Sequence, residues 1–308
     1  MLLTIVRKLT AFCVALLYAA AVQAGDFEDG LAAYERQDYA TALTKWRRAA
    51  QRGDAEAQFN LGQLYRRGDG IEQDYAEAVR LYKLAAQQGL AVAQFSLGVI
   101  YSKGQGVAQD YKEAVRWYQR ATAQGDADAQ TNLGTMYSEG TGVAQNYKEA
   151  VRLFQLAAKQ GLSAAQYNLG VMYEKGQGVA QDYKEAVRWY QQAAQQGDDS
   201  AQFSLGVMYE NGQGVVQDHK EAVRWYRLAA QQGLASAQNN LGGMYANGKG
   251  VLQDYARAYM WFNIAAVGGG ENKIKNRDIA ASKMTAQQIE QAQRMARECM
   301  NSNFTKCD

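Results

Sequence analysis

Residues 89–124 read GLAVAQFSLGVIYSKGQGVAQDYKEAVRWYQRATAQ, and blocks of this pattern occur six times in succession without an insertion or deletion. The copies begin at Gly53, Gly89, Gly125, Gly161, Gly197 and Gly233, which gives a constant period of 36 residues. A fixed period of roughly 20–50 residues is typical of repeat arrays, in which each unit buries its apolar face against its neighbours. The period therefore decides the fold class before any single residue is considered.

Each copy predicts two helices joined by a glycine-containing loop. In the first copy Asp54 is a candidate N-cap, and Ala57, Leu61 and Tyr65 follow at intervals of four on one helical face. Residues 68–70, Gly-Asp-Gly, end that helix. Asp74 begins a second helix, which the next glycine ends. We therefore expect an all-α chain of helix–loop–helix repeats.

One glycine recurs inside every first helix, although glycine in a helix costs up to about 1 kcal/mol relative to alanine. It is Gly98 in the second copy. We interpret its recurrence as a requirement for close helix packing at that position.

The N-terminal segment has the pattern of a secretory signal peptide. Arg7 and Lys8 precede an apolar run over residues 9–21, and residues 22–24 supply small residues for cleavage after Ala24. The apolar run is shorter than the roughly 20 residues of a membrane-spanning helix. We therefore expect an exported protein without a membrane span after cleavage, periplasmic in the first place, with secretion or surface association as alternatives.

The charge balance excludes some classes of partner. The chain has 33 Lys and Arg and 31 Asp and Glu, and loss of the two basic leader residues leaves 31 of each. Sequence-independent binding to nucleic acid requires a basic excess, so we expect no nucleic-acid partner.

Two cysteines, Cys299 and Cys307, remain after cleavage. In an exported chain an even number of cysteines suggests a disulfide. A metal or redox pair is the alternative, but the spacing differs from C-x-x-C and no histidine lies nearby. We predict a disulfide that staples the C-terminal tail.

The combination of A-Q-x-x-L-G-x-x-Y, the G-x-G-V loop and A-x-x-W-Y-x-x-A-A at constant period resembles the Sel-1-like repeat, a relative of the tetratricopeptide repeat. The resemblance covers roughly residues 27–268. It implies a right-handed α-solenoid whose first helices line a concave face, and an adaptor or scaffold function. A cysteine-rich branch of the family includes proteins that bind or hydrolyse β-lactams, but no repeat of this chain contains a cysteine.

Several patterns have packing explanations that outweigh chemical ones. The G-x-G loops follow helices, not strands, so they predict positive φ angles and not a nucleotide site. His219 takes a position that is tyrosine in the other five copies. It is the only histidine of the chain, so no metal site or histidine-based catalytic triad is predicted. Glu–Arg pairs such as Glu113 and Arg116 are expected to be exposed ion pairs. Trp117 and its equivalents alternate with leucine, which favours a packing role.

The variable positions of the first helices are the candidate binding residues. They comprise aromatic, valine and asparagine positions that would line a groove for an extended peptide or a partner helix: Phe59, Asn60, Phe95, Val99, Asn132, Tyr167, Asn168, Val171, Phe203, Val207 and Asn240. Two interpretations of the aromatics remain open: the rings line the groove, or they wedge neighbouring first helices together.

These patterns divide the chain into four parts: a signal peptide (1–24), an N-terminal capping helix pair (25–52), six repeats (53–268), and a C-terminal capping helix with a disulfide tail (269–308). We expect an exported scaffold that binds a protein or peptide, with no catalytic residues, metal or cofactor. The alternative is an enzyme acting on β-lactams or cell-wall fragments, which only the family analogy suggests.

Overall fold

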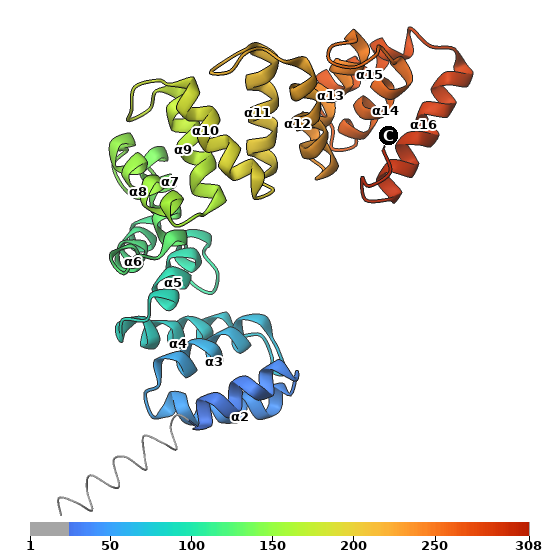
Figure 1. The fold of residues 1–308 in the computed structure, drawn as a ribbon. Coiled ribbons are helices and arrows are strands. Elements are labelled where there is room, and N and C mark those ends of the chain that lie inside the picture. The colour runs from blue at the N-terminus through green and yellow to red at the C-terminus, as the bar shows by residue number, and fades with distance from the viewer. Residues whose placement is uncertain (1–24, 308) are drawn as a thin grey trace, which may run out of the picture. The chain divides into compact units, whose positions relative to one another are not determined.

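The structure is a computed structural model that describes residues 25–307. Within that range the chain consists of helices and loops without a strand (Figure 1). This confirms the predicted all-α class, whereas the handedness of the array stays a prediction. The predicted leader, residues 1–24, lies outside the described residues. The chain divides into two compact units between Asn146 and Tyr147. We call residues 25–146 unit 1 and residues 147–307 unit 2.

Every copy of the repeat forms two helices. The first helices are α3 (Ala55–Arg67), α5 (Ala91–Lys103), α7 (Ala127–Glu139), α9 (Ser163–Lys175), α11 (Asp199–Asn211) and α13 (Ala235–Asn247). The second helices are α4 (Tyr75–Gln87), α6 (Tyr111–Ala123), α8 (Tyr147–Lys159), α10 (Tyr183–Gln195), α12 (His219–Gln231) and α14 (Tyr255–Ala265). A helix over residues 25–35 and α2 (Tyr39–Gln51) precede them, and α15 (Glu271–Ala281) and α16 (Ala286–Asn301) follow.

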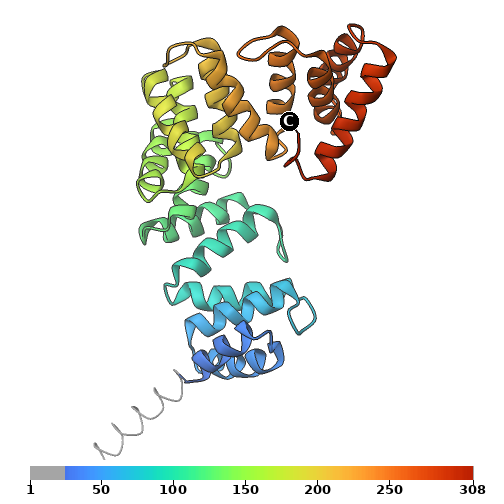
Figure 2. The ribbon, with the colours of Figure 1, turned by 45° about the vertical axis from the view of Figure 1, so that its right-hand side comes forward.

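Helices pack in sequence order within each unit. In unit 1, α3 packs against α4 and α5 against α6, while α4 also contacts α5 (Figure 2). In unit 2, α9 packs against α10, α11 against α12 and α13 against α14, with α10 and α12 contacting the helix that follows each of them. Helices α4, α10 and α12 therefore each lie between two first helices, as expected for an array with nearest-neighbour packing.

Capping side chains open most of the helices and a glycine loop ends every first helix, whereas α5, α9 and α13 follow a leucine that provides no side-chain cap. Asp54 accepts a hydrogen bond from the backbone N–H of Ala57, and Asp110 accepts from the N–H groups that open α6. In the loop after α5, Gly106 has φ 72°. A Cβ there would lie 2.5 Å from the Tyr75 side chain of the preceding copy, so the second glycine of G-x-G seats the loop on its neighbour. The positive φ predicted for these loops is confirmed.

In five of the first helices, α3, α5, α9, α11 and α13, the internal glycine admits a tyrosine or phenylalanine from the second helix of the same copy. At Gly98 an added Cβ would lie 2.4 Å from the ring of Tyr118, which is 3% exposed. The cost of a helical glycine is thus offset by the burial of a large ring directly against the helix backbone.

Buried glutamines connect successive copies. Gln94 is 5% exposed, and its amide donates to the carbonyl oxygen of Ala86 at 3.1 Å. Its own side-chain oxygen accepts from Gln124 at 2.8 Å. The same arrangement recurs at Gln202, which donates to Ala194 and accepts from Gln232. Ala86 and Ala194 also accept from the backbone N–H groups of Gly89 and Gly197, so each glutamine gives a carbonyl at the end of the preceding second helix a second donor.

The second helices bury one side and expose ion pairs on the other. Trp117 and Trp261 are buried, as are Leu81 and Leu153 at the equivalent position, in agreement with a packing role. The predicted Glu–Arg pairs form on exposed surfaces, for example Arg116 to Glu113 at 3.0 Å.

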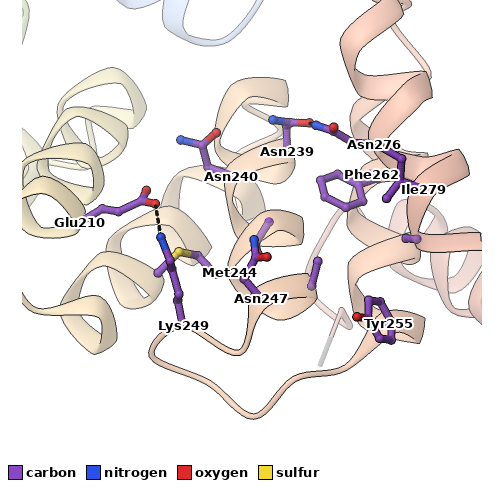
Figure 3. A pocket seen from close by; sticks show the side chains of 13 residues that line it. Glu210, Asn239, Asn240, Met244, Asn247, Lys249, Tyr255, Phe262, Asn276 and Ile279 are labelled. Atoms are coloured by element: carbon purple, nitrogen blue, oxygen red, sulfur yellow. Dashed lines mark hydrogen bonds and ion pairs between the residues drawn. The ribbon is translucent and has the colours of Figure 1, made fainter. Parts of the chain in front are cut away.

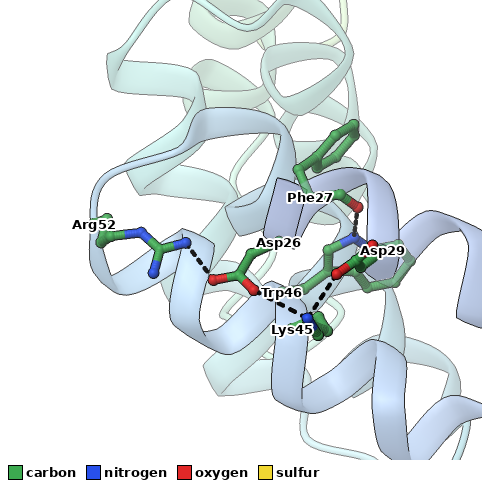
Figure 4. A network of polar contacts seen from close by, with 6 residues as sticks. All are labelled: Asp26, Phe27, Asp29, Lys45, Trp46 and Arg52. Carbon is green, nitrogen blue, oxygen red and sulfur yellow. Dashed lines mark hydrogen bonds and ion pairs between the residues drawn. The ribbon is translucent and has the colours of Figure 1, made fainter. Parts of the chain in front are cut away.

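A buried carboxylate holds the N-terminal helix pair together (Figure 4). Asp26 is 8% exposed and forms ion pairs with Arg52 at 2.5 Å and Lys45 at 3.3 Å. The Arg52 guanidinium beside it lowers the pKa of the Asp26 carboxyl. The indole N–H of Trp46 donates to the carbonyl oxygen of Phe27, so α2 is fixed to the preceding helix at two points.

The C-terminal part contains two helices where the sequence predicted one. The additional helix is α15, which packs against α14 after residues 268–270 end the last repeat. A capping box of Thr285 and Gln288 opens α16. Cys299 and Cys307 form a disulfide, and both are buried.

Candidate binding groove

One face of every first helix is left only half buried. It consists of the seventh, eleventh and fourteenth residues of each copy, which are spaced i, i+4, i+7 and therefore lie on one side of the helix. We call this set the first-helix stripe. On α5 it comprises Phe95, Val99 and Ser102. Across the six copies every member is half buried apart from Thr131, which is buried.

The aromatic residues of the stripe pack on rings of their own copy. Phe59 lies 5.3 Å from Tyr82 between ring centroids, and Phe95 lies 6.0 Å from Tyr118. In unit 2 the pairs are Tyr167 with Tyr190 at 5.7 Å, and Phe203 with Tyr226 at 5.8 Å. Each inner tyrosine belongs to the second helix and is buried. The stripe aromatics thus form the rim of the core, with one side against the second helix and the remainder accessible.

The asparagines beside the stripe reach tyrosine hydroxyls of the preceding copy. The amide of Asn132 donates to the Tyr118 hydroxyl at 3.3 Å, and Asn240 is a hydrogen-bond partner of the Tyr226 hydroxyl. Asn60 and Asn168 occupy the equivalent positions and are half buried. The amides at 132 and 240 therefore anchor a buried tyrosine as well as lining the surface.

Two glutamates of unit 2 complete this polar line, and the sequence had not singled them out. The Tyr190 hydroxyl donates to Glu174 at 2.5 Å, and the Tyr226 hydroxyl donates to Glu210 at 2.7 Å. Burial, and secondarily the neighbouring carboxylate, raises the pKa of both tyrosines. Both hydroxyls are therefore held as donors. The i+7 spacing of Glu174 and Glu210 from the stripe aromatics was the available signal.

Three pockets open along the stripe. In unit 1, one of about 250 Å³ lies between α3 and α5, and one of about 360 Å³ lies between α5 and α7. In unit 2, one of about 370 Å³ is lined by residues of α11, α13 and α15 (Figure 3).

The predicted residues divide between pocket linings and the rest of the stripe face. Phe95, Val99 and Asn132 line the pockets of unit 1, and Asn240 lines that of unit 2. The others are half buried on the same helices but line none of these three pockets: Phe59, Asn60, Tyr167, Asn168, Val171, Phe203 and Val207.

Residues 25–307 contain neither a candidate metal site nor a candidate membrane span. In that range no group of three or more His, Cys, Asp or Glu is arranged to hold a metal ion. In the same range no helix combines the length and apolar character needed to cross a membrane.

The repeats of this chain match a known repeat family. A sequence model of the Sel1 repeat matches six consecutive segments, 55–90, 91–126, 127–162, 163–198, 199–234 and 235–269. The crystal structure of a Sel1 repeat protein from Oxalobacter formigenes is similar, with 34% identity, a TM-score of 0.72, and coverage of 78% of this chain and 96% of that one. No curated protein matches the sequence significantly.

A second solved structure is more distant. It is c5321, described as a protective antigen present in uropathogenic Escherichia coli strains and displaying an SLR fold. It is 27% identical, with a TM-score of 0.51, and the match covers 92% of this chain and 85% of that one.

Proposed function

The chain belongs to the Sel1 repeat family, and we propose that it is an exported scaffold that binds an extended segment of a protein partner along the first-helix stripe. Proteins with this repeat generally act as scaffolds for protein interactions and not as enzymes.

The half-buried stripe is the observation that carries the proposal. Apolar side chains such as Val99 stand beside amides such as Asn132, and pockets open between successive first helices. An extended peptide needs both kinds of contact, because its side chains require apolar recesses while its main chain requires hydrogen-bonding groups. The exposed side of the second helices instead carries ion pairs, which are well solvated and contribute little binding energy.

The proposed location rests on the two ends of the chain. A basic, then apolar, then small-residue pattern over residues 1–24 is that of a cleaved export signal. The Cys299–Cys307 disulfide suits an oxidising compartment. The description of the related E. coli protein as a protective antigen also favours an extracytoplasmic location.

Site-specific crosslinking tests the binding surface. The photoreactive amino acid p-benzoylphenylalanine is placed at Val99 or Val171 on the stripe, and, as a matched control, at the exposed Lys112 or Lys184 on the second helices. We expect one protein of an envelope extract to crosslink to the stripe positions and not to the controls. Unlabelled protein should compete, and a Val99→Arg, Val171→Arg variant that retains its helical circular dichroism should not. Crosslinking confined to the second helices would show that the stripe is not the binding surface.

Export is tested separately. We expect the protein purified from a periplasmic fraction to begin at Gly25 when its N-terminal residue is sequenced. An intact N-terminus in the cytoplasmic fraction would contradict the proposed location without affecting the proposed binding surface.

A further inference from the structure

The sixth copy lacks the bulky stripe side chains of the copy before it. The fifth copy carries Phe203, Val207 and Glu210 at these positions, and the sixth carries Asn239, Gly243 and Ala246. All three replacements lie on one side of α13 and all three reduce side-chain volume. The pocket of about 370 Å³ lies at this place, within the range of roughly 300–1,000 Å³ for small-ligand sites.

Helix α15 closes one side of this pocket (Figure 3). Asn276 of α15 donates its amide hydrogen to the side-chain oxygen of Asn239 at 3.0 Å, which ties α15 to α13. Ile279 of the same helix supplies an apolar wall. In earlier repeats of unit 2, the first helix of the next copy follows in the place that α15 takes here. Because the sixth copy is the last of the array, α15 closes the groove of unit 2 at this pocket.

The lining offers both donors and acceptors at short range. In the bond between these two residues, Asn276 uses one N–H and Asn239 uses its side-chain oxygen. The side-chain oxygen of Asn276 can therefore still accept a hydrogen bond, and the NH₂ group of Asn239 can still donate. Asn247 donates to the backbone oxygen of Gly243 at 2.9 Å, and its own side-chain oxygen can still accept. This is the combination that a peptide group, with one N–H and one C=O, requires.

The charges of the lining cancel. Lys249 approaches Glu210 to 4.0 Å, and the other polar side chains are carboxamides and one tyrosine hydroxyl. A strongly charged ligand would find no net opposite charge here. The buried Met244 and Phe262 give the pocket an apolar floor.

We infer that this pocket binds a short, uncharged segment of peptide, with the carboxamides of Asn239, Asn247 and Asn276 pairing with its main chain and the apolar floor receiving a side chain. The inference rests on the proposed function, because the pocket is the end of the same groove. The Phe262 ring packs against α13 at Gly242 and is only 4% exposed, so it provides no open platform for a sugar ring.

Substitution of Gly243 tests the inference directly, because a side chain at this position would enter the pocket without a steric clash at its Cβ. A Cβ there meets no atom within 4 Å, and valine is the residue that three other copies carry at this position. The variant Gly243→Val is therefore expected to fold and to occupy the pocket. Asn239→Phe restores the aromatic of the fifth copy and is a second, independent filling variant. Ser236→Val places the same side chain at an exposed position of α13 and is the control.

The probe is a set of fluorescein-labelled tetrapeptide pools, acetylated and amidated at their ends and sorted into neutral, basic and acidic composition. Binding to the full protein is measured by fluorescence anisotropy. We expect the neutral pool to bind most tightly, and both filling variants to weaken it by about tenfold or more while Ser236→Val does not.

Three results would overturn the inference. They are the absence of binding to every pool, a preference for a charged pool, and binding of the neutral pool that both filling variants leave unchanged. If N-acetylglucosamine oligomers bind in place of peptides, and Gly243→Val abolishes that binding, the ligand of the pocket is a sugar and the assignment of a peptide ligand is wrong. If partner crosslinking at Val99 and Val171 persists in any of these cases, the proposed function stands and only the pocket inference fails.

Discussion

The fifth and sixth copies of the repeat share one set of residues and differ in another. Both have a buried glutamine (Gln202 and Gln238) and a helical glycine against an aromatic ring (Gly206 and Gly242). They differ along the first-helix stripe, where large side chains of the fifth copy give way to small ones in the sixth. The shared residues touch their own or the preceding second helix, so packing fixes them, whereas the stripe faces outward and is free to vary.

The difference indicates where binding specificity can reside. In the fifth copy the stripe is occupied by a phenylalanine on a buried tyrosine and by a glutamate that accepts from that tyrosine. In the sixth copy the ring is Phe262, which lacks the hydroxyl, and the space is a pocket. One architecture thus carries a filled and a hollow version of the same surface.

The two adjacent glycines of α13 should show the largest contrast. A Cβ at Gly242 would lie 2.8 Å from the ring of Phe262, whereas one at Gly243 meets open space. We expect Gly242→Ala to destabilise the protein by about 1–3 kcal/mol through overpacking. Gly243→Ala should stabilise it by up to about 1 kcal/mol, because alanine favours the helix. Guanidinium denaturation followed by circular dichroism measures both, and shifts of the midpoint in the same direction would contradict the distinction between shared and stripe positions.

The buried glutamines should give the next largest effects, and unequal ones. Gln202 donates to Ala194 and accepts from Gln232, so Gln202→Leu removes two buried hydrogen bonds, although Ala194 and Gln232 each keep a bond to Gly197. We expect a loss of about 1–3 kcal/mol. Gln238 donates to Ala230 in the same way, but its copy ends in Gly268 where the others have glutamine. Gln238→Leu should therefore cost less, and an equal or larger loss in the same denaturation assay would show that the second amide contributes nothing.

The sequence alone predicts most of the architecture because its signals are local. Capping aspartates such as Asp54 and the glycines that end each helix act on neighbouring residues; the glycines recur in all six copies, and the aspartate at the position of Asp54 recurs in three. Helix α15 was not predicted. Its two isoleucines, Ile274 and Ile279, are 39% and 53% exposed, so the helix has no buried apolar face whose period could reveal it.

The candidate site was predicted only in part, for a related reason. Phe95, Val99 and Asn132 could be chosen because they vary on a recognisable helical face. Glu210 acquires its role from Tyr226, which lies 16 residues further along the chain. The pocket beside it depends on Asn276 of the unpredicted α15. The i+7 spacing of Glu210 from Phe203 was an available signal, but its bond to Tyr226 and the place of Asn276, which lies outside the repeats, emerge only from the structure.

A smaller contrast concerns alkaline pH. Burial, and then Glu210, raises the pKa of Tyr226, whereas an unfolded tyrosine ionises near pH 10. Above about pH 10 the unfolded state therefore releases a proton that the folded state keeps, so stability is present below that pH and declines above it. Tyr226→Phe, which makes the fifth copy resemble the sixth, should cost about 1–2 kcal/mol at neutral pH by removing the bond to Glu210.

The same variant should also flatten the alkaline decline. Denaturation midpoints between pH 8 and 11 measure its slope, which should fall by up to about 1.4 kcal/mol per pH unit, the share of one phenol. Tyr111→Phe, at a ring that is 40% exposed, is the control for removing a hydroxyl elsewhere. A slope unchanged by Tyr226→Phe but reduced by the control would show that Tyr226 does not govern the alkaline sensitivity.

The smallest effect is expected on the outer face of the second helices, where the two copies differ in the sign of a charge. In the fifth copy Glu221 pairs with Arg224 at 3.2 Å, and in the sixth Arg257 takes the place of that glutamate and pairs with Asp254 at 2.9 Å. We expect Glu221→Gln to cost about 0.2–0.5 kcal/mol, an effect that salt should screen. Arg257→Gln should be nearly neutral, because the lost pair is offset by removing a positive charge from the N-terminal turn of α14. Midpoints in urea, which preserves the ionic strength, at low and high salt distinguish the two. A loss of stability for Arg257→Gln larger than that for Glu221→Gln would mean that the sixth copy depends on the Arg257 charge, although the dipole of α14 opposes it. The exposed face of α14, like the stripe of α13, would then have a role that the other copies lack.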